Sequence, residues 1–140
     1  MICGTIPPGV HKTSHYFAER EMFVDLRGNV SIDERAVFGF GVRLISMSHT
    51  LDQGDPGPAV TRNLRIDGPS WIASFALVSA SWVQAHSVVS AGAVVTGVIV
   101  PSYAMVQGNP AWIVARYDPQ GKRWERLAEP VKPAQWGGRR

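Results

Sequence analysis

Large apolar side chains recur at every sixth position along much of the chain. One series covers four positions, and after an irregular stretch two more series follow, the last of them one residue out of phase. Their members are Leu26, Ile32, Phe38 and Leu44, then Ile66, Ile72 and Val78, then Val83, Val89 and Val95. Neither a helix with about 3.6 residues per turn nor the alternation of a strand produces this period. The spacing therefore predicts a repeat architecture.

A second position of the repeat is also restricted. Two residues before most of the large side chains stands a small or β-branched residue. These residues are Val30, Ala36, Val42, Ser70, Ala76, Ser81, Ser87 and Ala93. In a solenoid each hexad supplies one short strand and one turn, three hexads close a triangular rung, and the rungs stack through parallel hydrogen bonds. We expect four or five rungs. The alternative is a β-sandwich with accidental spacing.

Residues 48–64, SHTLDQGDPGPAVTRNL, interrupt the period with glycine and proline, which is typical of an ordered loop that leaves the coil. We divide the chain into an N-terminal extension (1–25), a β-helix domain (26–116) with this loop at 48–64, and a basic C-terminal tail (117–140). Short helices are expected at Ser14–Met22 and at Lys122–Glu129, where Pro130 would end the second.

The excess of positive charge lies at one end of the chain. Residues 1–115 hold seven Lys and Arg against eight Asp and Glu, whereas residues 116–140 hold seven against three, and no charged residue occurs from Gly68 to Ala115. A solvated basic tail explains this better than a nucleic-acid-binding arm. No apolar run reaches the length of a membrane span. The single Cys3 and the start of the chain favour a reducing cytoplasm.

The run WIASFALVSASWVQAHSVVSAGAVVTGVIVPSYAMVQGNPAWIVAR, from Trp71 to Arg116, resembles hexapeptide-repeat acyltransferases, especially sugar O-acetyltransferases of the maltose, galactoside and exopolysaccharide type. GNPA at 108–111 is the most specific motif, and SMSHTLD at 46–52 resembles the catalytic-histidine segment. The likeness covers residues 26–116. It implies an all-β, single-stranded left-handed parallel β-helix, a homotrimer, acetyl-CoA as the donor and no metal.

The sequence departs from the family pattern in four places. Between Val78 and Val83 one residue is missing relative to the usual hexad, and within 96–101 the spacing indicates one extra. Two positions where the family usually carries a basic residue hold Gly97 and Trp112. The sequence therefore places no cationic side chain at these two positions to contact the phosphates of CoA.

Transfer of an acetyl group from a thioester to an alcohol needs a base near the hydroxyl and donors for the developing oxyanion. Within the resemblance His49 is the candidate base, because a neutral imidazole can accept a proton at physiological pH. As a plain loop histidine it would need no partner. Asp52 is a candidate to orient the ring or contact substrate, although it also fits an exposed loop carboxylate.

The resemblance assigns further contacts by position. Ser74, Ala91 and Thr96 match the rungs that contact CoA, Arg116 could meet a phosphate, and Trp71 matches an aromatic residue near the acyl or acceptor end. Each of them also fits the repeat as a turn or packing residue. The expected acceptor is a hydroxyl of a sugar or polysaccharide.

Three alternatives compete with this function: a metal pair, a carbonic anhydrase and a non-catalytic module. His11 and His15 could pair on a metal, but no third ligand is evident. A γ-type carbonic anhydrase has a related β-helical fold and needs three histidines in the coil. Only His49 and His86 are available there, so zinc catalysis is not expected. The competing function is a non-catalytic trimeric β-helix that acts as a structural or binding module.

Overall fold

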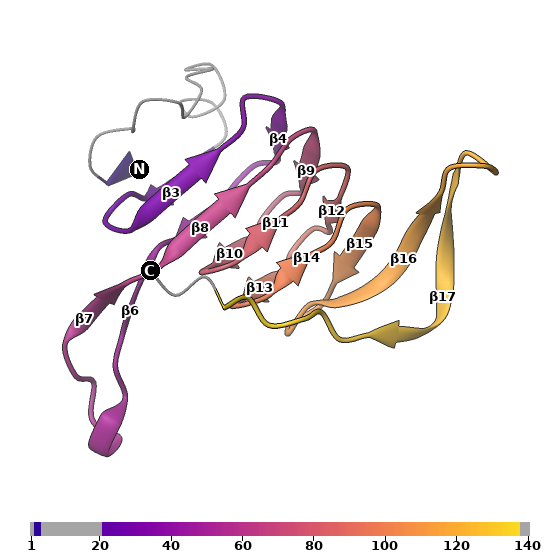
Figure 1. Cartoon of the computed structure of the whole chain (residues 1–140). Helices are drawn as coiled ribbons and strands as arrows, with labels where there is room; N and C mark the ends of the chain where they lie inside the picture. The colour runs from indigo at the N-terminus through magenta and orange to yellow at the C-terminus, as the bar shows by residue number, and fades with distance from the viewer. Residues whose placement is uncertain (1, 4–20, 138–140) are drawn as a thin grey trace.

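The structure is a computed structural model that describes residues 2–3 and 21–137 (Figure 1). The helix expected at Ser14–Met22 falls almost wholly outside these residues. Three parallel sheets form the body. Sheet A contains β1 (Ile2–Cys3), β2 (Phe23–Asp25), β5 (Arg43–Ile45), β10 (Leu77–Ser79) and β13 (Val94–Thr96). Sheet B contains β3 (Asn29–Ile32), β8 (Asn63–Ile66), β11 (Trp82–Val83) and β14 (Ile99–Val100). Sheet C begins with β4 (Ala36–Phe38), β9 (Ser70–Ile72), β12 (Val88–Val89) and β15 (Ala104–Gln107).

The chain visits the three sheets in a fixed order, from B to C to A, and then returns to B. Strands β3, β4 and β5 make one rung, β8, β9 and β10 the next, and β11, β12 and β13 the third, while β14 and β15 begin a fourth (Figure 1). All pairs between rungs are parallel. The predicted β-helix is therefore confirmed, with three complete rungs in the described residues and partial turns at either end.

The repeat side chains stack in three columns inside the coil. The column under sheet B holds Ile32, Ile66, Val83 and Val100, that under sheet C holds Phe38, Ile72, Val89 and Val106, and that under sheet A holds Val24, Leu44, Val78 and Val95. All twelve are buried. The first position differs from the prediction, because Val24 pairs with Leu44 and points inward, whereas Leu26 is only partly buried.

The small residues lie at the corners, as the pattern predicts. Seven of the eight are buried, and Ala36 is partly buried against the core. The buried serines satisfy their own hydroxyls locally: Ser70 Oγ donates to the carbonyl oxygen of Asp67 and Ser87 Oγ to that of Gln84, at 2.6 Å each. A small polar side chain can therefore occupy a tight corner without leaving an unpaired hydroxyl.

The corner from sheet A to sheet B is one residue short in two successive rungs. Val78 and Val83 are separated by five positions, and so are Val95 and Val100, which pairs in register with Val83. The prediction of one extra residue within 96–101 is therefore wrong, because the short corner between sheets A and B is repeated in the next rung. Ser81 supports this corner by accepting a hydrogen bond from the backbone N–H of Val98 at 3.1 Å.

The C-terminal part of the chain extends sheet C with antiparallel strands. β16 (Trp112–Asp118) pairs with β15, and β17 (Arg123–Val131) pairs with β16. The helix expected at Lys122–Glu129 is therefore wrong: this segment is strand, because its backbone groups find partners along β16. Pro130 lies within the strand. β16 also crosses the expected domain boundary at residue 116.

The last described residues return to the coil. The carbonyl oxygen of Ala134 accepts a hydrogen bond from Ile99 at 2.9 Å, and the N–H of Trp136 donates to Gly97 at 2.9 Å. The indole of Trp136 packs near that of Trp82, with ring centroids 6.5 Å apart. Residues 134–136 of the segment expected as a solvated tail are thus held against the coil. Within the described part of the chain, no helix is long and apolar enough to cross a membrane.

Candidate functional site

The predicted loop at 48–64 is an ordered arm that leaves the coil between sheets A and B. It consists of β6 (Met47–His49), a 3₁₀ turn η1 (Asp52–Gly54) and β7 (Ala59–Thr61), with β6 and β7 paired antiparallel. In Figure 1 the arm projects away from the stacked rungs. A hairpin of this kind brings polar side chains out of the coil and into reach of solvent or another molecule.

His49 is exposed at the end of β6, and its ring has a defined partner. Its Nδ1 atom lies 2.8 Å from the carbonyl oxygen of Gly57. A carbonyl oxygen can only accept, so Nδ1 must carry the proton in this contact. In the neutral ring the lone pair is then on Nε2, the atom that is free to take a proton from another group.

The tip of the arm is shaped so that this contact can form. Thr50 and Gly57 face each other, and the N–H of Gly57 donates to the carbonyl oxygen of Thr50 at 2.7 Å. A side chain at Gly57 would collide with the Thr50 hydroxyl. Asp52, the candidate to orient the ring, is exposed at the start of η1. The Nδ1 hydrogen bond goes to Gly57 instead, so a backbone group holds the ring in this structure.

The base of the arm is joined to the N-terminal end of the coil. Ser46 Oγ donates to the carbonyl oxygen of Asp25 and accepts from the N–H of Gly28 at 2.9 Å. The buried Asp25 carboxylate in turn accepts hydrogen bonds from the Arg27 guanidinium at 2.7 Å and 2.9 Å and from the Arg27 backbone N–H at 3.2 Å. These hydrogen bonds from Arg27 hold the pKa of Asp25 below its ordinary value, against the opposing effect of burial.

Three of the predicted site residues come together on the outer face of sheet C. Trp71, Ser74 and Ala91 line one cavity of about 270 Å³, together with Ala73, Val88, Ser90 and Met105. The small side chains belong to the segments that lead from β9 and β12 toward sheet A, and the larger apolar side chains belong to β9, β12 and β15. No charged side chain is among the described residues that line it. This cavity, called the slot below, suits a narrow and uncharged chain.

Two other candidates lie elsewhere. Thr96 is exposed at the end of β13 in sheet A, and Arg116 is exposed on β16. Neither lines the slot. Gly97 follows Thr96 at a turn with φ of 66°, and Trp112 begins β16 with its side chain partly exposed. Gly97 and Trp112, which stand where the family usually carries a basic residue, therefore place no charge near the slot.

His49 and the slot occupy different corners of the triangular coil. The arm leaves at the corner between sheets A and B, whereas Ser74 and Ala91 lie where the chain passes from sheet C to sheet A. Figure 1 shows the arm pointing away from the rungs that carry the slot. One protomer therefore does not bring its own imidazole and its own slot together.

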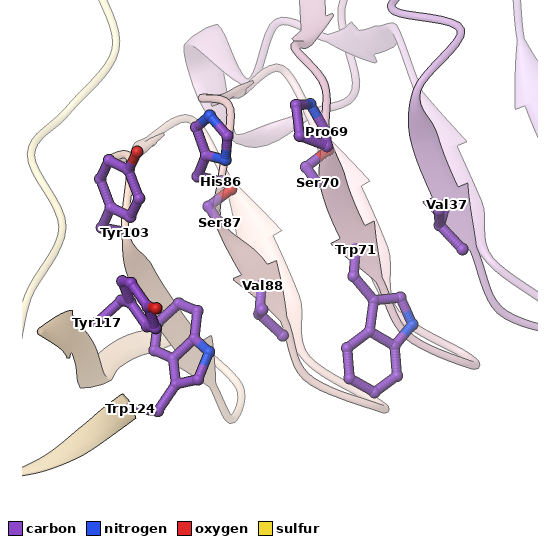
Figure 2. A pocket seen from close by; sticks show the side chains of 10 residues that line it. All are labelled: Val37, Pro69, Ser70, Trp71, His86, Ser87, Val88, Tyr103, Tyr117 and Trp124. Atoms are coloured by element: carbon purple, nitrogen blue, oxygen red, sulfur yellow. The ribbon is translucent and has the colours of Figure 1, made fainter. Parts of the chain in front are cut away.

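A second and larger cavity opens beside the slot, and no local sequence motif predicts it. This aromatic groove has a volume of about 480 Å³ and lies between sheet C and the hairpin of β16 and β17 (Figure 2). Its aromatic members are Trp71, His86, Tyr103, Tyr117 and Trp124. Sequence reasoning missed four of them because they belong to segments that only the fold brings together.

Four of these rings form a continuous series. His86 and Tyr103 are stacked with ring centroids 5.0 Å apart and planes 3° apart. Tyr103 and Tyr117 follow at 6.0 Å and 23°, and Trp124 meets Tyr117 edge-on at 5.6 Å. His86 is thus an aromatic wall residue. Among the described residues, no cluster of three or more His, Cys, Asp or Glu could hold a metal ion; His11 and His15 lie outside them.

No protein-family model and no curated protein matches the sequence. Among solved structures, a maltose O-acetyltransferase from Clostridium difficile 630 is similar at 17% identity with a TM-score of 0.65, covering 70% of this chain and 54% of that one. A hexapeptide-repeat-containing acetyltransferase from Vibrio cholerae O1 biovar eltor, complexed with acetyl-CoA, is similar at 25% identity with a TM-score of 0.47, covering 68% and 56%. The chain thus spans about half the length of these proteins. The first likeness confirms the expected left-handed hexapeptide-repeat fold.

Proposed function

We propose that this β-helix is an O-acetyltransferase that moves an acetyl group from acetyl-CoA to a hydroxyl of a sugar or polysaccharide. His49 Nε2 takes the proton of the acceptor hydroxyl, and the oxygen attacks the thioester carbonyl. Backbone N–H groups stabilise the oxyanion that forms. The intermediate then expels the thiolate of CoA, which takes the proton back from the imidazolium. The observation that carries the proposal is the exposed imidazole with its Nδ1 bonded to Gly57.

The hydrogen bond from His49 to Gly57 supports the role of a base. General base catalysis needs a proton acceptor whose lone pair is directed at the substrate rather than at the protein. With Nδ1 engaged, the ring is held in one tautomer and Nε2 is free. A loop histidine without such a partner would sample both tautomers and many orientations. The hydrogen bond to Gly57 restricts the ring to one tautomer and one orientation before substrate binds, so less entropy is lost in reaching the reactive geometry.

The slot fits the pantetheine part of acetyl-CoA. That part is a thin chain with amide groups and no formal charge. The slot is small, is lined by small side chains such as Ser74 and Ala91 and by apolar side chains such as Met105, and lacks charged groups among its described residues. Thr96 and Arg116 remain proposed contacts for more distant parts of the donor. When bound, acetyl-CoA supplies the activated acyl group.

The separation of His49 from the slot supports an assembly in which protomers share a site. The arm of one protomer would reach the slot of the next, and three copies would close a ring in which every slot receives one imidazole. We therefore propose a homotrimer with three shared sites. Such head-to-tail contacts use two different surfaces of each chain, here the arm and the outer face of sheet C.

The acceptor class rests on two points. The maltose O-acetyltransferase that shares the fold carries the predicted activity in its name. In addition, aromatic side chains such as Trp71 and Trp124 are exposed beside the slot. Such rings are common partners of sugar rings, whose C–H groups pack on an aromatic face.

The experiment that tests the activity measures release of free CoA thiol from acetyl-CoA in the presence of candidate sugars, with mass spectrometry of the sugar product. We expect thiol release that depends on the sugar and matches acetylated product. Binding of acetyl-CoA by the wild-type protein, measured separately by calorimetry, is the control. A protein that binds no acetyl-CoA and acetylates no sugar would instead be the non-catalytic trimeric module.

A further inference from the structure

We infer that the aromatic groove between sheet C and the hairpin of β16 and β17 binds a neutral oligosaccharide. The inference rests on the proposed function in one respect, since it takes this oligosaccharide to be the acetyl acceptor. The binding itself is independent of acetyl transfer and can be measured without the donor.

The size and shape of the groove suit a ligand of more than one ring. Its volume of about 480 Å³ falls among those of small-molecule sites, roughly 300–1,000 Å³. Figure 2 shows Val88 on the strand between Trp71, on one side, and Tyr117 with Trp124, on the other. The side chains of Trp71 and Trp124 are 52% and 38% exposed. Two accessible indoles with Val88 between them provide two stacking surfaces for one extended ligand.

The absence of charged side chains among the described residues that line the groove favours a neutral ligand. None of the described residues that line it is an Asp, Glu, Lys or Arg. The groove lies largely within the charge-free stretch from Gly68 to Ala115. An anionic or cationic ligand would lose hydration here without gaining an opposite charge. A neutral sugar loses less on binding because its hydroxyls can be paired one at a time.

The polar atoms that line the groove suit a ligand that carries hydroxyl groups. The Tyr103 and Tyr117 hydroxyls and the His86 ring nitrogens can each donate or accept, depending on the partner. A sugar hydroxyl has the same double capacity. In contrast, the hydroxyls of Ser70 and Ser87 already donate to the backbone of the coil. The polar groups available to a ligand are therefore those of the aromatic wall.

A flat aromatic ligand fits this wall less well than a sugar. Such a ligand gains most when it inserts between two rings, but both faces of Tyr103 are already covered, by His86 at 5.0 Å and by Tyr117 at 6.0 Å. The two exposed indoles of the groove are Trp71 and Trp124. They offer single faces to a ligand that has C–H groups on one side and hydroxyls around its rim.

The groove and the slot share two residues, Trp71 and Val88. A ligand in the groove and a chain in the slot would therefore meet over β9 and β12. This adjacency is what a transfer reaction requires of its two substrates. It also assigns Trp71 a position at the junction, consistent with the role at the acyl or acceptor end that the sequence resemblance implies.

Calorimetric titration of the full chain without acetyl-CoA tests the inference. The probes are three neutral trisaccharides, maltotriose, cellotriose and xylotriose, with trigalacturonic acid as a charged counterpart and adenosine as a planar one. We expect saturable binding of at least one neutral trisaccharide. Trp71→Ala and Trp124→Ala should each weaken it by about tenfold. Trp71→Phe, which keeps an aromatic face, should retain most of the affinity.

Trp112→Ala is the matched control, because this indole is also exposed on β16 but does not line the groove. It should leave the affinity unchanged. The inference is wrong if no neutral trisaccharide binds up to about 10 mM, if only trigalacturonic acid or adenosine binds, or if both indole variants bind like the wild type. Binding without acetyl transfer by the same protein would support the groove and contradict the proposed function. Acetyl transfer to a sugar without binding of any neutral trisaccharide in the groove would support the proposed function and contradict the inference about the groove.

Discussion

His49 Nδ1 and the carbonyl oxygen of Gly57 are 2.8 Å apart, and only the nitrogen of this pair can donate. The contact joins the end of β6 to the far side of the arm, eight residues along the chain. It determines which ring nitrogen is basic, so the backbone of the arm decides the chemistry of the exposed imidazole.

This contact predicts the tautomer of His49. In nitrogen-15 spectra of the neutral ring, Nδ1 should be protonated and Nε2 unprotonated. Gly57→Ala should disturb this state, because a methyl group there collides with the Thr50 hydroxyl and displaces the carbonyl. The double variant Thr50→Ala/Gly57→Ala removes the hydroxyl that causes the collision and should bring the spectrum back toward that of the wild type. A ring protonated on Nε2 in the wild type would contradict the proposed orientation.

The corner-to-corner separation of His49 and Ala91 predicts complementation between inactive variants. His49→Ala lacks the base, and Ala91→Trp fills the slot. Each should be inactive alone. If three protomers share head-to-tail sites, unfolding the two together in equal amounts and refolding them should restore about a quarter of wild-type activity.

The control for this experiment is Ser31→Trp, which adds the same side chain to an exposed position of β3, away from the slot. It should be active by itself. Mixtures of His49→Ala and Ala91→Trp that stay inactive, although both variants form the same oligomer as the wild type, would show that the sites are not shared.

The buried Asp25 predicts a pH-dependent contribution to stability. Because Arg27 holds the pKa of Asp25 below its unfolded value, the charged carboxylate stabilises the fold above that unfolded value, about 3.9. This contribution is lost as the pH falls from there toward the folded pKa. Asp25→Asn should reduce the free energy of unfolding by about 1–3 kcal/mol at pH 7. Urea titrations at several pH values should show the difference shrinking below about pH 4; a difference independent of pH would contradict this cause.

The inward columns predict a strong contrast between neighbouring positions. Ile72 is fully buried in the column under sheet C, whereas Val37, which pairs with Trp71 on the same sheet, is 49% exposed. Ile72→Ala should lower the free energy of unfolding by about 2–5 kcal/mol. Val37→Ala should change it by no more than about 0.5 kcal/mol. Equal effects of the two changes in denaturant titrations would be inconsistent with a coil packed around Ile72.

The coil could be predicted from the sequence because its core is periodic. Each inward position repeats at a fixed distance, so Ile66, Ile72 and Val78 identify three faces without any tertiary information. The prediction was less accurate at the ends of the series. Val24 rather than Leu26 begins the column under sheet A, and the corner between Val95 and Val100 is short where the spacing predicts an insertion. A local period cannot distinguish these cases when neighbouring apolar residues compete for one position.

The C-terminal hairpin could not be predicted in the same way. Residues 122–129 have no repeat to follow, and their helical appearance reflects local propensity. In the structure the backbone partners of Arg123 and Glu125 lie on β16, so tertiary pairing decides the strand. The aromatic groove depends on that hairpin, because Trp124 reaches sheet C only through it. His49 could be named from a local motif, but its partner Gly57 required the folded arm.

The most direct measurement is the rate of acetyl transfer by His49→Ala compared with wild type under saturating acetyl-CoA and sugar. Loss of the base should lower kcat by about 10²- to 10⁴-fold, while the melting temperature and the affinity for acetyl-CoA stay at their wild-type values because the side chain is exposed. Ser48→Ala, at the preceding exposed position, should retain wild-type turnover. A His49→Ala protein that transfers acetyl groups as fast as the wild type would contradict the proposed mechanism.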